Sequence, residues 1–284
     1  MSVFTLKIIA MAAMVCDHLG HWLLSEGIIG MDVCTLMRAI GRIAFPIFAF
    51  LIANGYRHSR DRLRYLTRLL GFAVISQIPF TIVFSGENYA ASPGALHFEL
   101  MHPAYLIIAL LLGLLWYRFV RAGLSALLPP LALILGLSTL RSGGIYLLRP
   151  DMNVFYTLAL GLALICVLDE GSKERGTGFY ARAAALLLAL ILVWDRADYG
   201  LNGILLILLF WYFYDKRMQQ LLLMMLWALL QYSPFSGMTI YFICACLAAL
   251  PLLLYKGRPG PPLKAAFYLV YPLHLLLIAF AVIV

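Results

Sequence analysis

The first apolar stretch, Phe4 to Leu24, carries the side chains best suited to chemistry in this sequence. Lys7, Asp17, His18 and His21 interrupt a segment that is otherwise hydrophobic. Ionisable groups at membrane depth are costly and usually serve a function. On an α-helix His21 lies one turn beyond Asp17 and His18 and therefore beside both. Asp17 and His18 are immediate neighbours and therefore point in different directions.

Two interpretations of these groups stay open at this point. Lys7 and His18 share nearly the same helix face, about 16 Å apart along the axis. Lys7 either extends to the cytoplasmic headgroups or belongs to the site. His18 is suited to take a proton from an amine or hydroxyl as that group attacks an activated acyl carbon. This chemistry requires a polar cavity within the bilayer.

Two arginines follow in the next predicted span, residues 34–56. Arg38 and Arg42 are four residues apart and share one helix face. Each of these side chains would cost roughly several kcal/mol if it faced lipid, so we expect both arginines to have an anionic partner. Asp17 or Glu99 would satisfy them structurally. The functional alternative is that one arginine stabilises an oxyanion, a carboxylate or a phosphate.

The last apolar stretch, residues 264–284, holds Tyr268, Tyr271 and His274 around Pro272. A histidine in such a helix is often a hydrogen-bonding core residue. Proline within a helix leaves a backbone carbonyl without its usual partner, and the resulting kink often marks a cavity. His274 is therefore a second candidate for the site.

The composition indicates a polytopic membrane protein rather than a soluble domain. Hydrophobic residues make up 64% of the chain and charged residues 12%, and the mean hydropathy is +0.94. The net charge of +8 comes from short basic runs between apolar stretches, as the positive-inside rule requires, so we expect no nucleic-acid partner. The five cysteines lack metal-ligand spacing and we expect no metal, although His97 and His102 flank Glu99.

We expect an all-α transmembrane bundle, a single domain over residues 1–284, with a cytoplasmic amino terminus. The most basic segment, Arg57 to Arg68, follows the second span and should be cytoplasmic. Apolar stretches then recur, which predicts about 9–11 spans in total. The stretches are near residues 4–24, 34–56, 63–84, 103–117, 122–140, 153–168, 181–194, 201–214, 219–232, 237–255 and 264–284.

Scattered motifs resemble the TraX family, bacterial inner-membrane proteins named for the pilin N-acetylase of conjugation systems. The spacing from Lys7 to His18 is also similar to the basic-x10-His signature of the broader membrane acyltransferase-3 superfamily. The matching runs are Leu6-Lys7-Ile8-Ile9-Ala10, Met14, Asp17-His18, Arg38 to Phe50, Gly55, Arg64-Tyr65-Leu66, Arg68-Leu69, Ala73 to Phe80, Asn153-Val154, Thr157, Ala197-Asp198-Tyr199-Gly200, Phe267-Tyr268 and Tyr271-Pro272-Leu273-His274.

The resemblance implies a multi-pass acetyltransferase of the bacterial cytoplasmic membrane. It would move an acetyl group from cytoplasmic acetyl-CoA to an amine or hydroxyl of a surface-destined pilin or envelope glycan. His18 would be the general base, with Asp17 and Arg42 as its companions. Our hypothesis for binding the acetyl-CoA phosphates uses Arg57, Arg60, Arg64 and Arg68. Our hypothesis for the substrate uses Lys7, His21, Arg38, Gln77, Tyr271 and His274.

Two departures from the family pattern bear on these expectations. Gln77 stands where the family usually has glutamate, and residues 97–140 look like an extra hairpin. Two other functions also stay open. In a transporter or flippase, the same groups would relay protons or hold an anionic substrate. In a non-catalytic pilus assembly factor, replacing His18 would have no effect.

Overall fold

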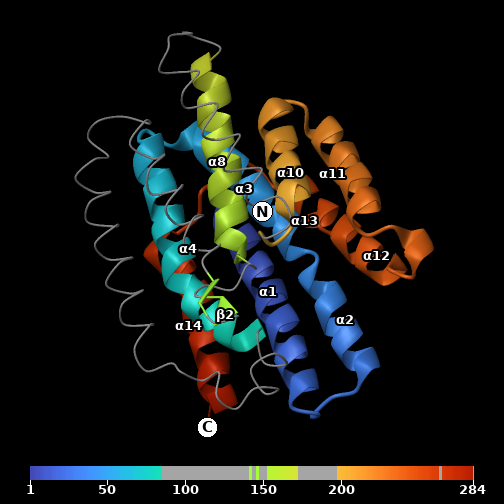
Figure 1. Cartoon of the computed structure of the whole chain (residues 1–284). Coiled ribbons are helices and arrows are strands. Elements are labelled where there is room, and N and C mark those ends of the chain that lie inside the picture. Colours follow the sequence, from blue (N-terminus) through green and yellow to red (C-terminus); the bar gives the residue numbers. More distant parts are fainter. Residues whose placement is uncertain (85–140, 143–144, 147–151, 172–196, 262–263, 284) are drawn as a thin grey trace. The chain divides into compact units, whose positions relative to one another are not determined.

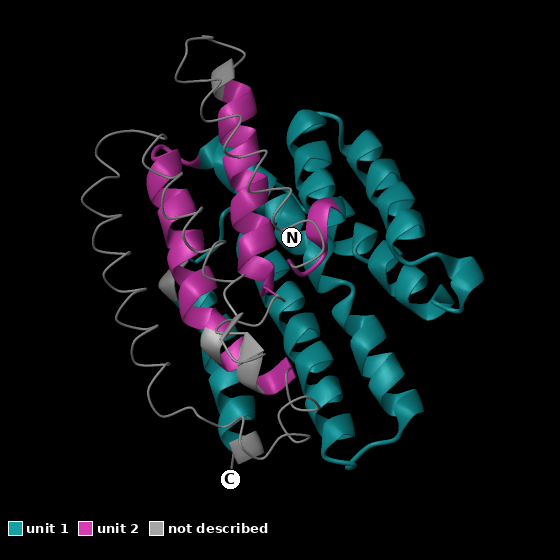
Figure 2. Ribbon diagram, in the orientation of Figure 1, with its two compact units in different colours: residues 1–58, 202–284 teal, residues 59–201 magenta. Residues whose placement is uncertain are grey.

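The computed structural model describes residues 1–84, 141–142, 145–146, 152–171, 197–261 and 264–283 (Figure 1). The chain divides into two compact units, which we describe separately (Figure 2). Unit 1 comprises residues 1–58 and 202–284, and unit 2 comprises residues 59–201. In the described residues the regular elements are helices, two isolated β-bridges and one short antiparallel ladder, in which β1 (Arg141–Ser142) pairs with β2 (Ile145–Tyr146).

The helices coincide with the apolar stretches predicted from the sequence, wherever those stretches are described. Unit 1 contains α1 (Val3–Ser25), α2 (Met31–Gly41), α3 (Ala44–His58), α10 (Gly200–Tyr212, which begins two residues before the boundary), α11 (Arg217–Gln231), the 3-10 turn η3 (Pro234–Ser236), α12 (Thr239–Leu247), α13 (Ala249–Leu253) and α14 (Lys264–Ile283). Unit 2 contains α4 (Arg62–Phe84) and α8 (Val154–Gly171).

Among the described residues, two helical segments are long and apolar enough to cross a membrane. These are Val3–Ser25 and Met31–His58, and shorter apolar helices follow. The helical architecture is therefore confirmed for the described part of the chain. The total of nine to eleven spans stays a prediction, because three of the expected spans and the extra segment 97–140 lie outside the described residues.

The second predicted span is not one continuous helix. It breaks between α2 and α3 at Arg42 and Ile43, whose backbone N–H groups bond three residues back, to Ala39 and Ile40. The reason lies at Pro46, which has no N–H to bond the Arg42 carbonyl and whose ring collides with it. The span predicted over residues 34–56 lies within the long apolar segment Met31–His58, and the local break inside it was not predicted, although Pro46 was visible in the sequence.

The same rule explains a second break, within the predicted span 237–255. The helix there divides into α12, which ends at Leu247, and α13, which begins at Ala249. Pro251 stands four residues after Leu247 and has no N–H to donate to that residue's carbonyl. In both cases one expected span is two helical pieces.

Two glycines bring α1 and α2 into close contact. A Cβ at Gly41 would lie 2.3 Å from the Cβ of Asp17, and a Cβ at Gly20 would lie 2.7 Å from the Cβ of Met37. Only a residue without a side chain fits at either position. Small residues allow the same close approach between helices in membranes. α1 also packs against α3 and α14, so it is the central helix of unit 1.

Backbone contacts gather several basic segments of unit 1 at the amino-terminal end of α1. The N–H of Val3 donates to the Arg258 carbonyl at 2.8 Å, and that of Lys256 donates to the Met1 carbonyl at 3.0 Å. The Arg217 guanidinium donates to the Leu252 carbonyl. We call this the basic end of unit 1. It agrees with the prediction that these segments share one side of the membrane.

In unit 2, α4 packs against α8 through a buried polar contact. The Asn153 side chain accepts from the Phe155 N–H at 3.1 Å and so caps the start of α8. Its amide donates to the Gln77 side-chain oxygen at 2.9 Å and to the Ala73 carbonyl at 2.7 Å. At the other end of the pair, Arg62 and Asp169 form an ion pair at 2.7 Å.

We predict that Gly41→Ala lowers the free energy of unfolding by about 1–3 kcal/mol, because the new methyl group overlaps Asp17. The matched control is Gly71→Ala in α4, where an added Cβ meets nothing within 4 Å. That change should be neutral or stabilising by up to about 1 kcal/mol, since alanine favours the helix. Thermal unfolding of the detergent-purified variants measures both. Equal effects would contradict the tight α1–α2 contact.

Candidate functional site

Two buried histidines meet between α1 and α14. The Nδ1 of His18 lies 2.6 Å from the Nε2 of His274, and the two rings are nearly parallel, at 16°. Only 8% of His18 and 9% of His274 is exposed. The ring of Tyr271 packs edge-on against both imidazoles, with centroids 5.9 Å from His18 and 5.5 Å from His274. The structure thus pairs two buried histidines from opposite ends of the sequence.

His274 has a second contact, with the backbone of its own helix. Its Nδ1 lies 2.8 Å from the carbonyl oxygen of Val270, one turn earlier in α14. The imidazole is therefore held at both nitrogens. A ring fixed in this way has one orientation, which also fixes the direction from which it meets His18.

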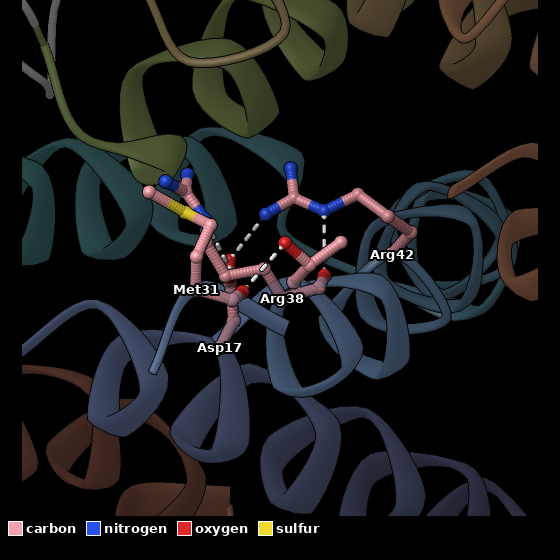
Figure 3. Close-up of polar contacts among 5 residues, drawn as sticks. Asp17, Met31, Arg38 and Arg42 are labelled. Carbon is pink, nitrogen blue, oxygen red and sulfur yellow. Dashed lines mark hydrogen bonds and ion pairs between the residues drawn. The ribbon is translucent and has the colours of Figure 1, made fainter. Parts of the chain in front are cut away.

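Asp17 faces away from the histidine pair, toward α2. Its carboxylate lies 2.6 Å from the Arg42 guanidinium and 3.4 Å from the Nε of Arg38, as Figure 3 shows. The expectation that Asp17 is the anionic partner of both arginines is confirmed. Glu99, the other candidate, lies outside the described residues. We call Asp17, Arg38 and Arg42 the arginine cluster.

The two arginines differ in how much water they see. The Arg42 side chain is 13% exposed, that of Arg38 is 41% exposed, and Asp17 is 17% exposed. Screening by water weakens the Arg38 contact more than the Arg42 contact. One carboxylate between two guanidinium groups leaves a formal charge of +1 in the cluster. Such a site attracts a further oxygen that carries or develops negative charge.

The break between α2 and α3 directs the Arg42 side chain back along α2. Its Nε donates to the Arg38 carbonyl at 3.0 Å, and its guanidinium lies 5.8 Å from the Tyr241 ring centroid. Asp17 and His18 are consecutive residues of α1, so the arginine cluster and the histidine pair adjoin each other in unit 1.

Other residues predicted for the substrate lie elsewhere. Lys7 is near the basic end, with its Nζ 4.6 Å from the centroid of the Phe267 ring. Gln77 belongs to unit 2, where its side-chain oxygen accepts from the backbone N–H and the amide of Asn153. This contact gives Gln77 a clear structural part in joining α4 to α8. Its predicted role toward substrate stays a prediction.

The four arginines predicted to bind acetyl-CoA are divided between the units. In unit 1, Arg57 lies over the Tyr214 ring, with its guanidinium carbon 5.1 Å from the centroid. Unit 2 contains Arg60, Arg64 and Arg68. There the Arg64 guanidinium is 3.3 Å from Asp61, and that of Arg68 is 6.0 Å from the Tyr65 ring centroid.

The sequence reasoning missed an aromatic and basic group at the basic end of unit 1. The Arg217 guanidinium carbon lies 5.2 Å from the Phe50 ring centroid and 5.3 Å from that of Tyr255. The Tyr214 hydroxyl donates to the Asn54 side-chain oxygen at 3.2 Å, one turn after Phe50 in α3. In the sequence, Arg217 is one of several basic residues between apolar stretches. Its place next to two aromatic rings depends on contacts between distant segments.

Nothing in the described residues resembles a metal centre, since no three His, Cys, Asp or Glu side chains gather closely enough to hold an ion. The site therefore offers two kinds of group. The histidine pair is suited to proton transfer, and the arginine cluster is suited to stabilise negative charge.

Comparison with known proteins connects this geometry to a family. The family described as TraX protein matches residues 2–120 and 147–283. A probable fimbrial assembly protein FimC, serogroup H1, of Dichelobacter nodosus is 42% identical over 79 residues, which cover 28% of this chain and 31% of that protein. The uncharacterized protein RP591 of Rickettsia prowazekii (strain Madrid E) is 42% identical over 79 residues, which cover 28% of this chain and 27% of that protein.

The chain thus matches less than a third of the length of each relative. No solved structure matches this protein. The family match and the two long apolar helices together indicate a membrane protein.

We predict that Asp17 is coupled more strongly to Arg42 than to Arg38. Double-mutant cycles that combine Asp17→Asn with Arg42→Gln or with Arg38→Gln test this through thermal unfolding. The more buried pair should show a coupling energy of about 1–3 kcal/mol, whereas the partly exposed pair should stay below about 1 kcal/mol. Equal coupling energies would mean that burial does not distinguish the two arginines.

Proposed function

Because the chain belongs to the TraX family, we propose that it is a membrane-bound acetyltransferase that uses cytoplasmic acetyl-CoA. The observation that carries the proposal is the buried contact between His18 and His274 beside the arginine cluster. Burying two histidines between apolar helices costs free energy, and ionisable groups at membrane depth usually serve a function. Proton transfer during acyl transfer is the purpose that these groups fit best.

In the proposed reaction, His18 takes the proton from an amine or hydroxyl of the acceptor. The acceptor nitrogen or oxygen forms a bond to the thioester carbon of acetyl-CoA, whose oxygen becomes negative. The bond from that carbon to sulfur then breaks, and the acetyl group stays on the acceptor. The CoA thiolate leaves and recovers the proton from His18. Acetyl-CoA and the acceptor thus yield CoA and the acetylated acceptor, with no other reactant.

The arginine cluster supports this reaction through its charge. Its formal charge of +1 favours the negative oxygen that develops on the thioester carbon. We assign this role to Arg42, which Asp17 and the Arg38 carbonyl hold in place. A guanidinium held in advance needs little reorganisation during the reaction. Arg38, His21, Lys7 and Tyr271 are proposed to contact the substrates.

We place the nucleotide part of acetyl-CoA at the basic end of unit 1. Arg57 and Arg217, which lie over the rings of Tyr214 and Tyr255, carry the guanidinium groups that we propose bind its phosphates. Arg60, Arg64 and Arg68, which follow Arg57 in the sequence, are proposed to attract the donor by their positive charge. Their position after the second span supports a cytoplasmic location for the donor.

The acceptor we propose is a surface-destined molecule, a pilin amino terminus or an envelope glycan, met at the bacterial inner membrane. Support comes from the TraX family and from a relative whose name denotes fimbrial assembly. That name also favours a second candidate function, a part in pilus assembly without catalysis. The two functions differ in whether His18 matters.

We predict that His18→Ala lowers acetyl transfer at least about 100-fold, because the base is lost. The assay measures release of the CoA thiol by the full-length protein in detergent, with acetyl-CoA and a panel of short peptides and amino sugars as acceptors. Cys16→Ala, a change on the same helix at a free thiol, is the matched control and should retain activity. Thermal unfolding checks that both variants fold.

Substantial transfer by folded His18→Ala would exclude His18 as the base. Absence of any turnover by the unaltered protein, together with normal pilus assembly in cells carrying His18→Ala, would favour the assembly function instead.

We also predict that Arg57→Gln raises the KM for acetyl-CoA about tenfold, because a charged contact to phosphate is lost. The matched control is Lys216→Gln, which removes the same charge from an exposed position next to Arg217. Its KM should change less than about twofold, because Lys216 is exposed like Arg57 but is not among the residues proposed to bind the donor. Equal effects of the two variants would indicate general electrostatic attraction rather than a site at Arg57.

A further inference from the structure

The carbonyl oxygen of Val270 determines where the protons of the histidine pair lie. A carbonyl oxygen only accepts hydrogen bonds, so the Nδ1 of His274 that contacts it must carry a hydrogen. In the neutral imidazole of His274 the other nitrogen, Nε2, is then without hydrogen and is an acceptor. That nitrogen is the one that faces His18.

The same reasoning extends to His18. Its Nδ1 lies 2.6 Å from the Nε2 acceptor of His274, so it must be the donor and carry a hydrogen. In neutral His18 the lone pair is therefore on Nε2. A histidine acts as a general base through the nitrogen that has no hydrogen. The direction of two hydrogen bonds thus follows from one backbone carbonyl.

We propose that His274 is a positioning residue, which holds His18 in the tautomer whose Nε2 takes the acceptor proton. This proposal rests on the acetyltransferase function proposed above and assigns to His274 a role distinct from substrate binding. In many hydrolases a carboxylate fixes the tautomer of the catalytic histidine. Here Asp17 binds arginines instead, and the partner of His18 is a second imidazole.

The imidazole partner also shares the proton during the reaction. When Nε2 of His18 takes the acceptor proton, His18 becomes a cation, and its Nδ1 hydrogen is able to move to Nε2 of His274. The positive charge is then spread over two rings. No proton is lost to solvent in this step, and its reversal restores the proton for the departing CoA thiolate.

Two substitutions of His274 separate positioning from packing. In His274→Gln the side-chain amide oxygen reaches about as far as Nε2 of the histidine and accepts the hydrogen bond from His18 in its place. His274→Leu fills similar space without an acceptor. We expect His274→Leu to lower kcat about 100-fold or more, with the KM for acetyl-CoA within about threefold. His274→Gln should recover kcat to within about tenfold of the unaltered protein.

A nuclear magnetic resonance measurement tests the tautomer without any activity. The chain has six histidines, so [15N]histidine-labelled protein gives few signals, and His18→Gln identifies that of His18. The expected spectrum shows His18 protonated at Nδ1 in the unaltered protein and in His274→Gln, but not in His274→Leu.

Detection of His18 protonated at Nε2 in the unaltered protein would overturn the proposal, and so would equal kcat values for the two His274 variants. The first of these results requires no acceptor. If the tautomer is as expected and no acetyl transfer is found, the proposed function fails while the arrangement of the pair stands.

Discussion

The structure of unit 1 depends on burying ionisable groups inside apolar helices, which requires a partner for each of them. Asp17 is the clearest case, because its carboxylate lies 2.6 Å from Arg42 in a place where little water reaches it. Removing one member of such a pair leaves an uncompensated charge, which is more costly than never having the pair. The positions of α1 and α2 are therefore tied to the geometry of this contact. The two glycines that let these helices approach serve the same requirement.

Local backbone features make the contact achievable. Gly41 leaves room for Asp17, and Pro46 breaks the helix at the residue that carries the second guanidinium. In an unbroken helix the backbone N–H of Arg42 would donate to the Arg38 carbonyl. The Nε of Arg42 would then compete for the same acceptor. The break supplies that carbonyl as an acceptor. Sequence, local structure and charge pairing thus agree at this point of the chain.

Much of this arrangement could be predicted from the sequence, because it depends on residues that are close in the chain or on the free-energy cost of burying a charge. The positions of the described helices follow from hydrophobicity, and Asp17 was a foreseeable partner for two arginines on one helix face. The break at Arg42 was also accessible, since the rule for Pro46 needs only the spacing. The TraX motifs, which the family match confirms, depend on residue identity alone.

The rest depends on which distant segments meet, and no local signal carries that information. His18 and His274 are 256 positions apart, so each appeared in the sequence as a separate polar residue in an apolar stretch. Gln77 looked like a site residue because it is polar, and its contact with Asn153 emerges only when α4 and α8 are packed. Arg217 could not be distinguished from other loop charges until Phe50 and Tyr255 were placed beside it.

The arrangement of α1 shows why adjacent residues serve different tasks. Neighbours on a helix are about 100° apart, so Asp17 reaches α2 while His18 reaches α14. A carboxylate beside His18 would favour the imidazolium and weaken its tendency to release the proton again. The Asp17 carboxylate instead binds the two arginines and fixes their positions. The partner of His18 is a neutral imidazole, that of His274. Two consecutive residues of one helix thus have separate tasks, Asp17 in charge pairing and His18 in proton transfer.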